Sequence, residues 1–300
     1  MAEDNLHPRW GLGSVNHQFF WMQCFIQAAM IVLVVLFGAE SKVLLVLALV
    51  GLILLGIPHG GNDFYYRPDK SFGGSIRFLV YYTGCMLLYL AIWWLFSWLA
   101  LLIFLVISMH HFGQSNFENS RWNAPESLMW GGWLLVFPMV KHASEVVSIF
   151  SEMLGFSATN IDFKGPYSDV ETLGFTICFG LIYAWVLVLR KTPYRWQYLF
   201  QWGMVSVWYW LTPLILGFVV VFCYWHALQS MRYQIVYIKQ RDRASIGSII
   251  RGFLPLGLLA LLGMAVCTSF DVMNHLGLGF VLLSLVSLPH VVVMDGIYRK

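Results

Sequence analysis

The chain has 300 residues, of which 59% are hydrophobic and only 11% are charged, and its net charge is +3. Soluble domains are about 25% charged, so a soluble fold of this size would lack the ionisable groups that cover a surface. This composition excludes a soluble enzyme and a disordered protein, and the small net charge argues against nucleic acid as a partner. We expect an all-α, polytopic membrane protein folded as a single integral membrane domain over residues 1–300.

Apolar runs predict the membrane-spanning helices, because a hydrocarbon core of about 30 Å needs about 20 apolar residues per helix. The long apolar stretch 78–112 must fold back, and we place the reversal near Ser97. Residues 1–17 are expected to be a cytoplasmic N-terminal segment. Residues 141–171 carry seven charged side chains and are expected to be an extracytoplasmic loop, with or without an interfacial helix. In chain order the ten predicted spans are 18–38, 43–59, 76–95, 97–112, 128–149, 172–190, 197–211, 213–231, 252–269 and 276–296.

The positions of the basic residues predict the orientation. If the N-terminus is cytoplasmic, 15 of the 18 Lys and Arg residues fall on the cytoplasmic side of these spans and three on the outer side. Cytoplasmic loops of membrane proteins are enriched in Lys and Arg. Removing or adding one span would destroy this separation. The sequence therefore predicts a multi-pass protein of the cell membrane with both termini in the cytoplasm.

Five of the nine histidines fall at one depth in this topology. They lie near the cytoplasmic ends of the even-numbered spans, which supply imidazoles from four different helices. Ionisable groups inside a membrane are costly and are usually functional, and neutral imidazole is the commonest metal ligand in proteins. We therefore predict a metal site at this level. The five histidines are His59, His110, His111, His226 and His290.

Two carboxylates and two prolines accompany these histidines. Asp63 follows His59 by four residues, so on a continuous helix it shares a face with His59 and can orient an imidazole from behind. A solvated cytoplasmic carboxylate is an equal alternative for Asp63, and it is the favoured interpretation for Asp295. Pro58 and Pro289 each precede a histidine directly, where a proline bends the helix and frees a carbonyl group.

These residues form an ordered set of short motifs that resembles the Brp/Blh family of membrane carotenoid oxygenases, the bacterial and archaeal β-carotene 15,15′-dioxygenases. The motifs are Pro58-His59-Gly60 with Asp63, His111-Phe112-Gly113, Trp225-His226 and Pro289-His290. The resemblance implies an all-helical membrane enzyme with non-haem Fe(II). It implies that the enzyme splits the central double bond of β-carotene with O2 and releases retinal. The implied catalytic iron ligands are His59, His111, His226 and His290.

The sequence departs from the family pattern at two positions. Asn116 stands where the family usually has an acid, and Ser230 stands where a second histidine usually follows the late Trp-His element by four residues. His110 is a candidate to compensate for the missing imidazole, although on an ideal helix it points about 100° away from His111. We predict that Asp63, His110, Asn116 and Ser230 lie behind the metal ligands. Phe112, Tyr224 and Trp225 are predicted to line a tunnel for the polyene.

Three other functions remain open from the sequence. One is an iron-dependent membrane enzyme that acts on another carotenoid, an isoprenoid or a lipid, which the Ser230 departure keeps open. The second is a non-catalytic transporter or proton-coupled channel, although the histidines gather at one depth and do not cross the membrane. The third is haem binding by a pair of histidines, which would leave the other histidines unexplained. The expected partners are a hydrophobic substrate, O2 and the lipid bilayer, and the sequence predicts no oligomeric state.

Overall fold

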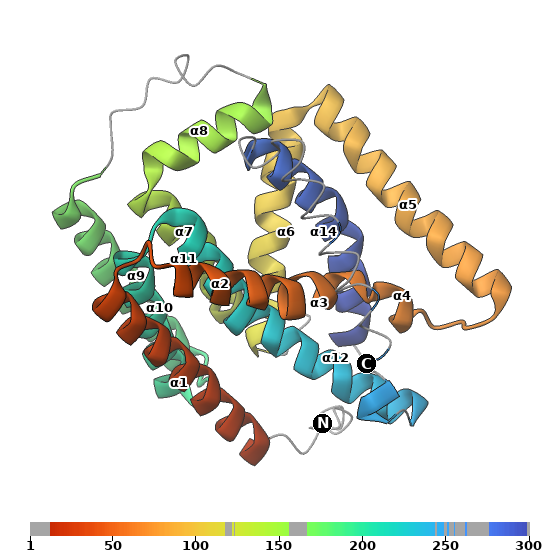
Figure 1. Cartoon of the computed structure of the whole chain (residues 1–300), viewed down its shortest axis with the longest axis horizontal. Coiled ribbons are helices and arrows are strands. Elements are labelled where there is room, and N and C mark those ends of the chain that lie inside the picture. The colour runs from red at the N-terminus through yellow and green to blue at the C-terminus, as the bar shows by residue number, and fades with distance from the viewer. Residues whose placement is uncertain are drawn as a thin grey trace.

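The computed structural model describes residues 13–117, 122, 124–155, 167–243, 245–248, 251, 255, 262 and 276–298. Every regular element in these ranges is a helix, and the long helices pack side by side as a bundle (Figure 1). The longer helices are α1 (Gly13–Phe37), α2 (Lys42–Gly51), α5 (Phe72–Leu95), α6 (Ser97–Phe117), α7 (Pro125–Lys141), α8 (Ala143–Leu154), α9 (Asp169–Leu189), α10 (Arg195–Leu211), α11 (Leu214–Val221), α12 (Leu228–Asp242) and α14 (Leu276–Tyr298). The short ones are the π-helix η1 (Leu52–Gly56), α3 (Ile57–Gly61), α4 (Asp63–Tyr66) and the π-helix η3 (Phe222–Ala227).

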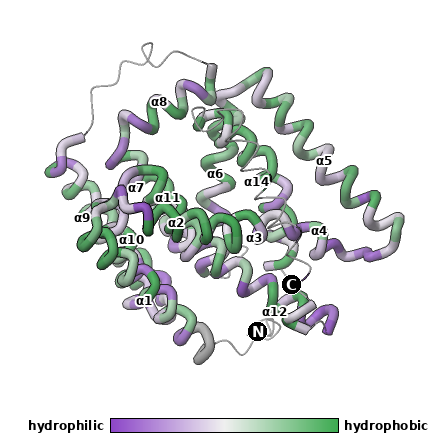
Figure 2. Tube along the Cα trace, viewed as in Figure 1, coloured by the Kyte–Doolittle hydropathy of each residue, from purple (hydrophilic) through white to green (hydrophobic). Residues whose placement is uncertain are grey.

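The outer surface of the bundle is apolar, as expected for a protein in lipid. Among the described residues, seven helices are long and apolar enough to cross a membrane, or eight if the bent pair α7–α8 is counted as one span. Large side chains such as Phe72 and Trp94 are 84% and 85% exposed. Figure 2 shows hydrophobic colouring along most of the long helices. Such exposure is unfavourable in water and favourable in a hydrocarbon core.

The seven helices account for only part of the ten predicted spans. The predicted fold-back near Ser97 is confirmed, because α5 ends at Leu95 and α6 begins at Ser97. The seventh predicted span corresponds to α10, which has 17 residues and so lies at the lower limit for crossing a bilayer. Almost all of the ninth predicted span, 252–269, lies outside the described residues.

The fifth predicted span, 128–149, is wrong as one continuous helix, because the chain bends sharply after Lys141. The helix α7 ends at Lys141, and α8 leaves it at an angle of 105°. The reason is the residue pattern of α8, where the buried Val146, Ile149 and Met153 alternate with exposed polar residues at helical spacing. A helix with one apolar face and one polar face lies across the end of a bundle more favourably than through the membrane.

Two glycines allow α6 and α7 to approach closely. A Cβ atom on Gly113 would lie 1.9 Å from the carbonyl oxygen of Ser127, and a Cβ on Gly131 would lie 1.7 Å from the carbonyl oxygen of Met109. Small residues at such crossings bring helix backbones into contact inside membranes. Because α6 carries the motif His111-Phe112-Gly113, this contact fixes the position of His111.

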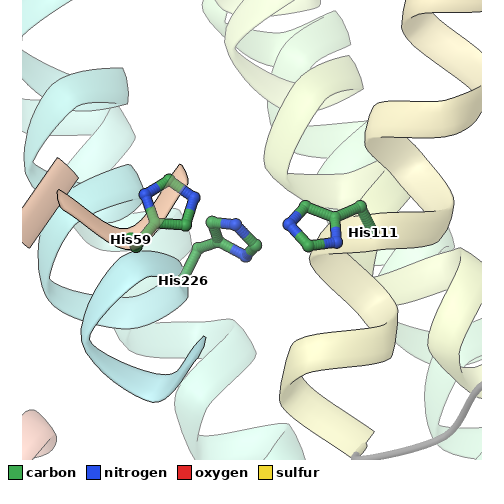
Figure 3. Close-up of side chains that lie close together, drawn as sticks. All are labelled: His59, His111 and His226. Atoms are coloured by element: carbon green, nitrogen blue, oxygen red, sulfur yellow. The ribbon is translucent and has the colours of Figure 1, made fainter. Parts of the chain in front are cut away.

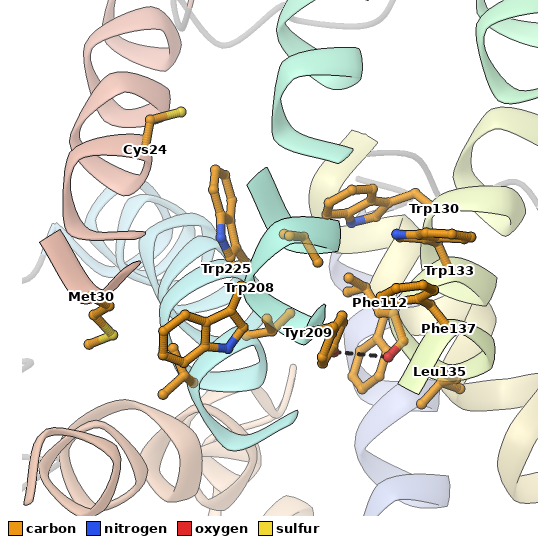
Figure 4. Close-up of a cluster of buried hydrophobic side chains, with 14 of the residues drawn as sticks. Cys24, Met30, Phe112, Trp130, Trp133, Leu135, Phe137, Trp208, Tyr209 and Trp225 are labelled. Carbon is orange, nitrogen blue, oxygen red and sulfur yellow. Dashed lines mark hydrogen bonds between the residues drawn. The ribbon is translucent and has the colours of Figure 1, made fainter. Parts of the chain in front are cut away.

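The largest buried cluster is aromatic and lies beside the histidine-bearing helices. Trp133, Trp208 and Tyr209 are completely buried, and each finds a hydrogen-bond partner for its polar group. The hydroxyl of Tyr209 donates to the carbonyl oxygen of Leu134 at 3.0 Å (Figure 4). The indole of Trp133 donates to Ser206 at 3.1 Å. Aromatic rings buried with satisfied polar groups give a rigid support for the neighbouring site.

Candidate metal centre

Two π-helical segments lie at the histidines in the centre of the bundle. The segment η1 directly precedes α3, which contains His59, and η3 contains His226. A π-helical turn holds one more residue than an α-helical turn, and such turns occur frequently at functional sites. The two segments pack against each other through Gly56, where a Cβ would lie 3.1 Å from Phe222 and 3.2 Å from Cys223.

Buried glutamines satisfy backbone carbonyl groups in these segments. The side-chain amide of Gln23, from α1, donates to the carbonyl oxygens of Tyr224 and Trp225 at 2.9 and 3.2 Å. The amide of Gln234, from α12, donates to the carbonyl oxygen of His59 at 2.8 Å. Buried carbonyl groups without a partner are costly, so these glutamines stabilise the irregular backbone that positions the two histidines.

Four imidazoles from four separate segments of the chain meet in the interior. The metal-binding nitrogens of His59, His111 and His226 lie within 4.8 Å of one another, and Figure 3 shows the three side chains gathered around one space. The ring of His290 lies 5.1 Å from that of His59 and 4.8 Å from that of His111, centroid to centroid. All four are at most 5% exposed. The structure thus brings the four predicted ligands together.

Oxygen atoms behind the group fix the orientation of His59 and His226. The Nδ1 of His59 forms a hydrogen bond with the carbonyl oxygen of Gly56. A carbonyl oxygen can only accept, so Nδ1 carries the proton. The hydroxyl of Ser115 donates to the carbonyl oxygen of Phe112 at 3.0 Å and lies 2.8 Å from Nδ1 of His226. Since its proton is used, Ser115 accepts from His226. Both histidines therefore present an unprotonated Nε2 to the interior.

Side-chain oxygens perform the same role for His290 and His111. The Nδ1 of His290 donates to Asp63 at 2.8 Å, and the hydroxyl of Tyr82 donates to the other oxygen of the same carboxylate at 3.0 Å. The Nδ1 of His111 lies 3.5 Å from the amide oxygen of Gln114, which makes this the weakest of the four contacts. Partners of this kind fix the tautomer and the ring direction of metal-binding histidines.

The inward-facing nitrogens fit a metal ion. Nε2 of His226 is buried and has no hydrogen-bond partner among the residues that the structure describes. The Nε2 atoms of His111 and His290 lie 3.2 Å apart, within hydrogen-bond distance of each other. Metal–nitrogen bonds of about 2.1 Å at tetrahedral or octahedral angles separate neighbouring ligand nitrogens by about 3.0–3.4 Å. An all-imidazole set suits Fe, Cu, Zn or Ni.

A hydrophobic cavity of about 340 Å³ adjoins the four histidines. His59, His111, His226 and His290 all contribute to its wall. The rest of the wall is almost entirely apolar, with Ser108 and Ser287 as its side-chain hydroxyls. A cavity with this lining favours a hydrocarbon ligand over a polar one.

The comparisons with known proteins agree with this site. A family model described as beta-carotene 15,15′-dioxygenase matches residues 50–298. The chain belongs to this family. A curated beta-carotene 15,15′-dioxygenase from uncultured marine bacterium 66A03 is 26% identical over 278 residues, which are 84% of this chain and 93% of the relative. No solved structure matches the chain.

The match to the dioxygenase family model begins after α1. Gln23 and Gln27, which bond the Tyr224–Trp225 segment, therefore lie outside the matched residues. The helix α1 adds support for His226 from a part of the chain that the family model does not cover.

The two departures from the dioxygenase motifs lie outside the three-histidine group. Asn116 forms two amide–amide hydrogen bonds with Gln201, of 3.2 and 2.9 Å, and so connects α6 to α10. The hydroxyl of Ser230 is buried without a hydrogen-bond partner in the described part of the chain. His110 stacks on Trp122 with the ring centroids 3.6 Å apart, and its Nε2 lies 3.9 Å from Asp295.

Of the three predicted tunnel residues, one lines the cavity. The ring of Phe112 belongs to the wall and lies 4.5 Å from that of His226. Tyr224 and Trp225 are not in the wall, because their polar groups bond to α2 and α1, at the carbonyl oxygen of Leu47 and at Gln27. Phe218 and Phe222, from the same stretch of chain, line the cavity in their place.

Sequence reasoning missed several polar residues that hold the dioxygenase histidines in place. Ser115 and Gln114 follow His111 by four and three residues, and Tyr82 and Gln234 lie far from it in the sequence. The available signal was a polar side chain inside an apolar run, because such a side chain must find a partner in the membrane interior.

Proposed function

We propose that this protein is a non-haem Fe(II) dioxygenase that cleaves the central double bond of β-carotene with O2 to give two molecules of retinal. The observation that carries the proposal is the group of four buried imidazoles, three of them with Nδ1 within 2.8 Å of an oxygen, at the wall of a hydrophobic cavity. The reaction balances without a reductant, because one C=C bond breaks and each of its two carbons receives one oxygen atom of O2. The family match and the curated relative support this activity.

In this proposal His59, His111, His226 and His290 hold the iron. Bound Fe(II) would supply the activation of O2 toward an electron-rich double bond. The protein does the rest by positioning. Asp63, Ser115, the Gly56 carbonyl group and Gln114 keep Nδ1 of each imidazole protonated and turned outward.

The wall of the cavity excludes water and aligns the polyene. Phe112 and Phe222 have their rings 4.5 and 5.6 Å from that of His226. Their π faces can stabilise positive charge that develops on the polyene as oxygen attacks. A substrate that partitions into lipid reaches such a cavity without crossing water.

We also propose that the chain crosses the cell membrane ten times with both termini in the cytoplasm. Three ion pairs join segments that this topology places on the same side. Lys70 pairs with Asp242 and Arg190 with Glu126 on the cytoplasmic side, and Lys141 pairs with Asp169 on the outer side. The four histidines then lie in the cytoplasmic half of the bilayer, and the 141–171 segment, which includes α8, lies outside.

The test uses a bacterium that accumulates β-carotene. Expression of the wild type should bleach the orange colour and produce retinal, and the purified protein should contain about one iron per chain. His226→Ala should lose both the iron and the retinal, whereas His142→Ala, at the other end of the bundle, should retain both. Iron binding and retinal formation that survive in His226→Ala would disprove the assignment of the site.

A second candidate is an iron enzyme that acts on another carotenoid, an isoprenoid or a lipid. The hydroxyl of Ser230 favours it, because it is buried without a partner among the described residues and departs from the family motif close to the proposed ligand His226. Unbleached cells that contain well-expressed, iron-loaded protein would favour this candidate over β-carotene cleavage.

A further inference from the structure

The cavity at the histidines extends to the buried face of α8. Val146, Ile149 and Met153 line it there, and each of them is 7–8% exposed. Figure 1 shows α8 lying across the end of the bundle where α6 and α14 begin and α7 stops. The 105° bend after α7 produces this arrangement. The cavity therefore has a wall of side chains at one end and the imidazole group at the other.

The distance between the two ends follows from the helices that run along the cavity. On α14, both Phe280 and His290 line it, and their separation of ten positions along the helix corresponds to about 15 Å at 1.5 Å per residue. On the α11–η3 segment, Leu214 and His226 line it, and their separation of twelve positions corresponds to about 18 Å at the α-helical rise. The space between α8 and the histidines is thus 15–18 Å along the helix axes, estimated from helix rise.

One half of a β-carotene molecule matches this length. Eight bonds separate the central double bond from the carbon next to the ring, and an extended chain advances about 1.2 Å per bond, so this part measures about 10 Å. The ring adds about 4 Å at similar bond lengths. A half-molecule of about 14 Å by this measure thus fits between α8 and the histidines with its central bond at the imidazoles.

We propose that the α8 face formed by Val146, Ile149 and Met153 is the stop for one ring of the carotenoid, and that its distance from the histidines selects which double bond is cleaved. This inference rests on the proposed function and adds the determinant of its regiospecificity. Only one ring needs to be recognised, because the bond is selected by distance from the inserted end. The apolar character of the wall requires that the inserted end be a hydrocarbon ring.

A change in the size of a side chain at the α8 stop should therefore shift the position of cleavage in steps of one double bond. Successive double bonds of a polyene are two bonds apart, or about 2.5 Å. A larger side chain at position 149 holds the ring back and brings a double bond closer to the ring to the histidines. A smaller side chain lets the ring go deeper and brings a more distant double bond there.

The experiment uses the purified, iron-loaded full-length protein and a carotenoid with a single ring, β-apo-8′-carotenal, so that the ring-containing product reports the position of the cut. The wild type should give retinal, with 20 carbons. Ile149→Trp should give mainly the 18-carbon ketone, and Ile149→Ala should add the 22-carbon aldehyde. Ser148→Trp, which places the same ring on the exposed face of α8, should still give retinal alone.

The outcomes separate the two proposals. Retinal as the sole ring-containing product of an active Ile149→Trp or Ile149→Ala variant would overturn the α8 stop and leave the dioxygenase function intact. If Ile149→Trp does not fold, Ile149→Ala decides by the same criterion. A wild type that leaves both β-apo-8′-carotenal and β-carotene uncleaved would overturn the proposed function, and the α8 stop with it.

Discussion

Three of the four buried imidazoles of the site are held in one tautomer by an oxygen atom within 2.8 Å of Nδ1. The carboxylate of Asp63 does this for His290, and Tyr82 in turn donates to Asp63. The orientation of such ligands determines metal affinity, because the lone pairs must converge on one point. The consequences are measurable at single residues.

Replacement of Asp63 should weaken metal binding without removing a ligand. Asp63→Leu leaves the Nδ1–H of His290 without an acceptor and should lower iron affinity about 10–100-fold. Asp63→Asn keeps one acceptor oxygen and should recover part of the loss. Competition titration with a chelator measures the affinity, and Asp69→Asn in the exposed loop is the control. Equal affinity of wild type and Asp63→Leu would refute this role.

Replacement of Gln23 tests the support from α1. Gln23→Leu removes the donor to the carbonyl oxygens of Tyr224 and Trp225, and a buried group without a partner costs about 1–3 kcal/mol. We expect a lower melting temperature in detergent together with weaker iron binding, because η3 carries His226. Gln18→Leu, at an exposed position of the same helix, should change neither quantity. A loss of stability with unchanged iron affinity would show that α1 supports the fold alone.

At the level of elements, the close crossing of α6 and α7 determines where His111 stands. The crossing depends on Gly113 and Gly131, which leave no room for a Cβ against the facing backbone. Because the facing atoms belong to the backbone, they cannot move aside as a flexible side chain would. The effect of a single added methyl group should therefore be large.

Gly131→Ala should destabilise the protein by about 1–3 kcal/mol, the usual cost of overpacking. Its Cβ would meet the carbonyl oxygen of Met109, so α6 must shift and carry His111 with it. Gly84→Ala on α5 is the matched control, because nothing lies within 4 Å of its added Cβ. Thermal unfolding in detergent compares the two variants. If both melt at the same temperature, the close crossing contributes no stability.

For the whole molecule, the proposed topology places the histidine end of the bundle toward the cytoplasm. Cysteines introduced into a background without the five native ones can be probed in intact cells with a membrane-impermeant maleimide. Asp169→Cys, at the α8 end, should be labelled, and Asp69→Cys, at the histidine end, should be labelled only after lysis. Labelling with the opposite pattern would invert the orientation and leave the site geometry unchanged.

Much of the site was predictable from the sequence, because burial and depth follow from composition. The apolar runs predicted helices, and the basic residues predicted one depth for five histidines. Four of these meet in the structure. Asp63, for which two interpretations were equally open, bonds to His290. The match to the dioxygenase family supports the motif-based resemblance.

The direction in which a side chain points around its helix was not predictable. A π-helical turn adds one residue and rotates the following face by about 100°. In η3, Trp225 and Tyr224 face α1 and α2, while Phe222 faces the cavity. The bend between α7 and α8 escaped prediction in the same way, because it depends on which surface the apolar face of α8 can cover.

The sequence by itself predicted that this protein lies in a membrane and that its histidines share a level, and its motifs resemble one family. These features depend on composition and order, which every conformation of the chain retains. Only the tertiary structure decided which oxygens hold the imidazoles, which aromatic rings line the cavity and where the cavity ends. Those features depend on packing between helices that are distant in the chain, and close packing is specific to the folded arrangement.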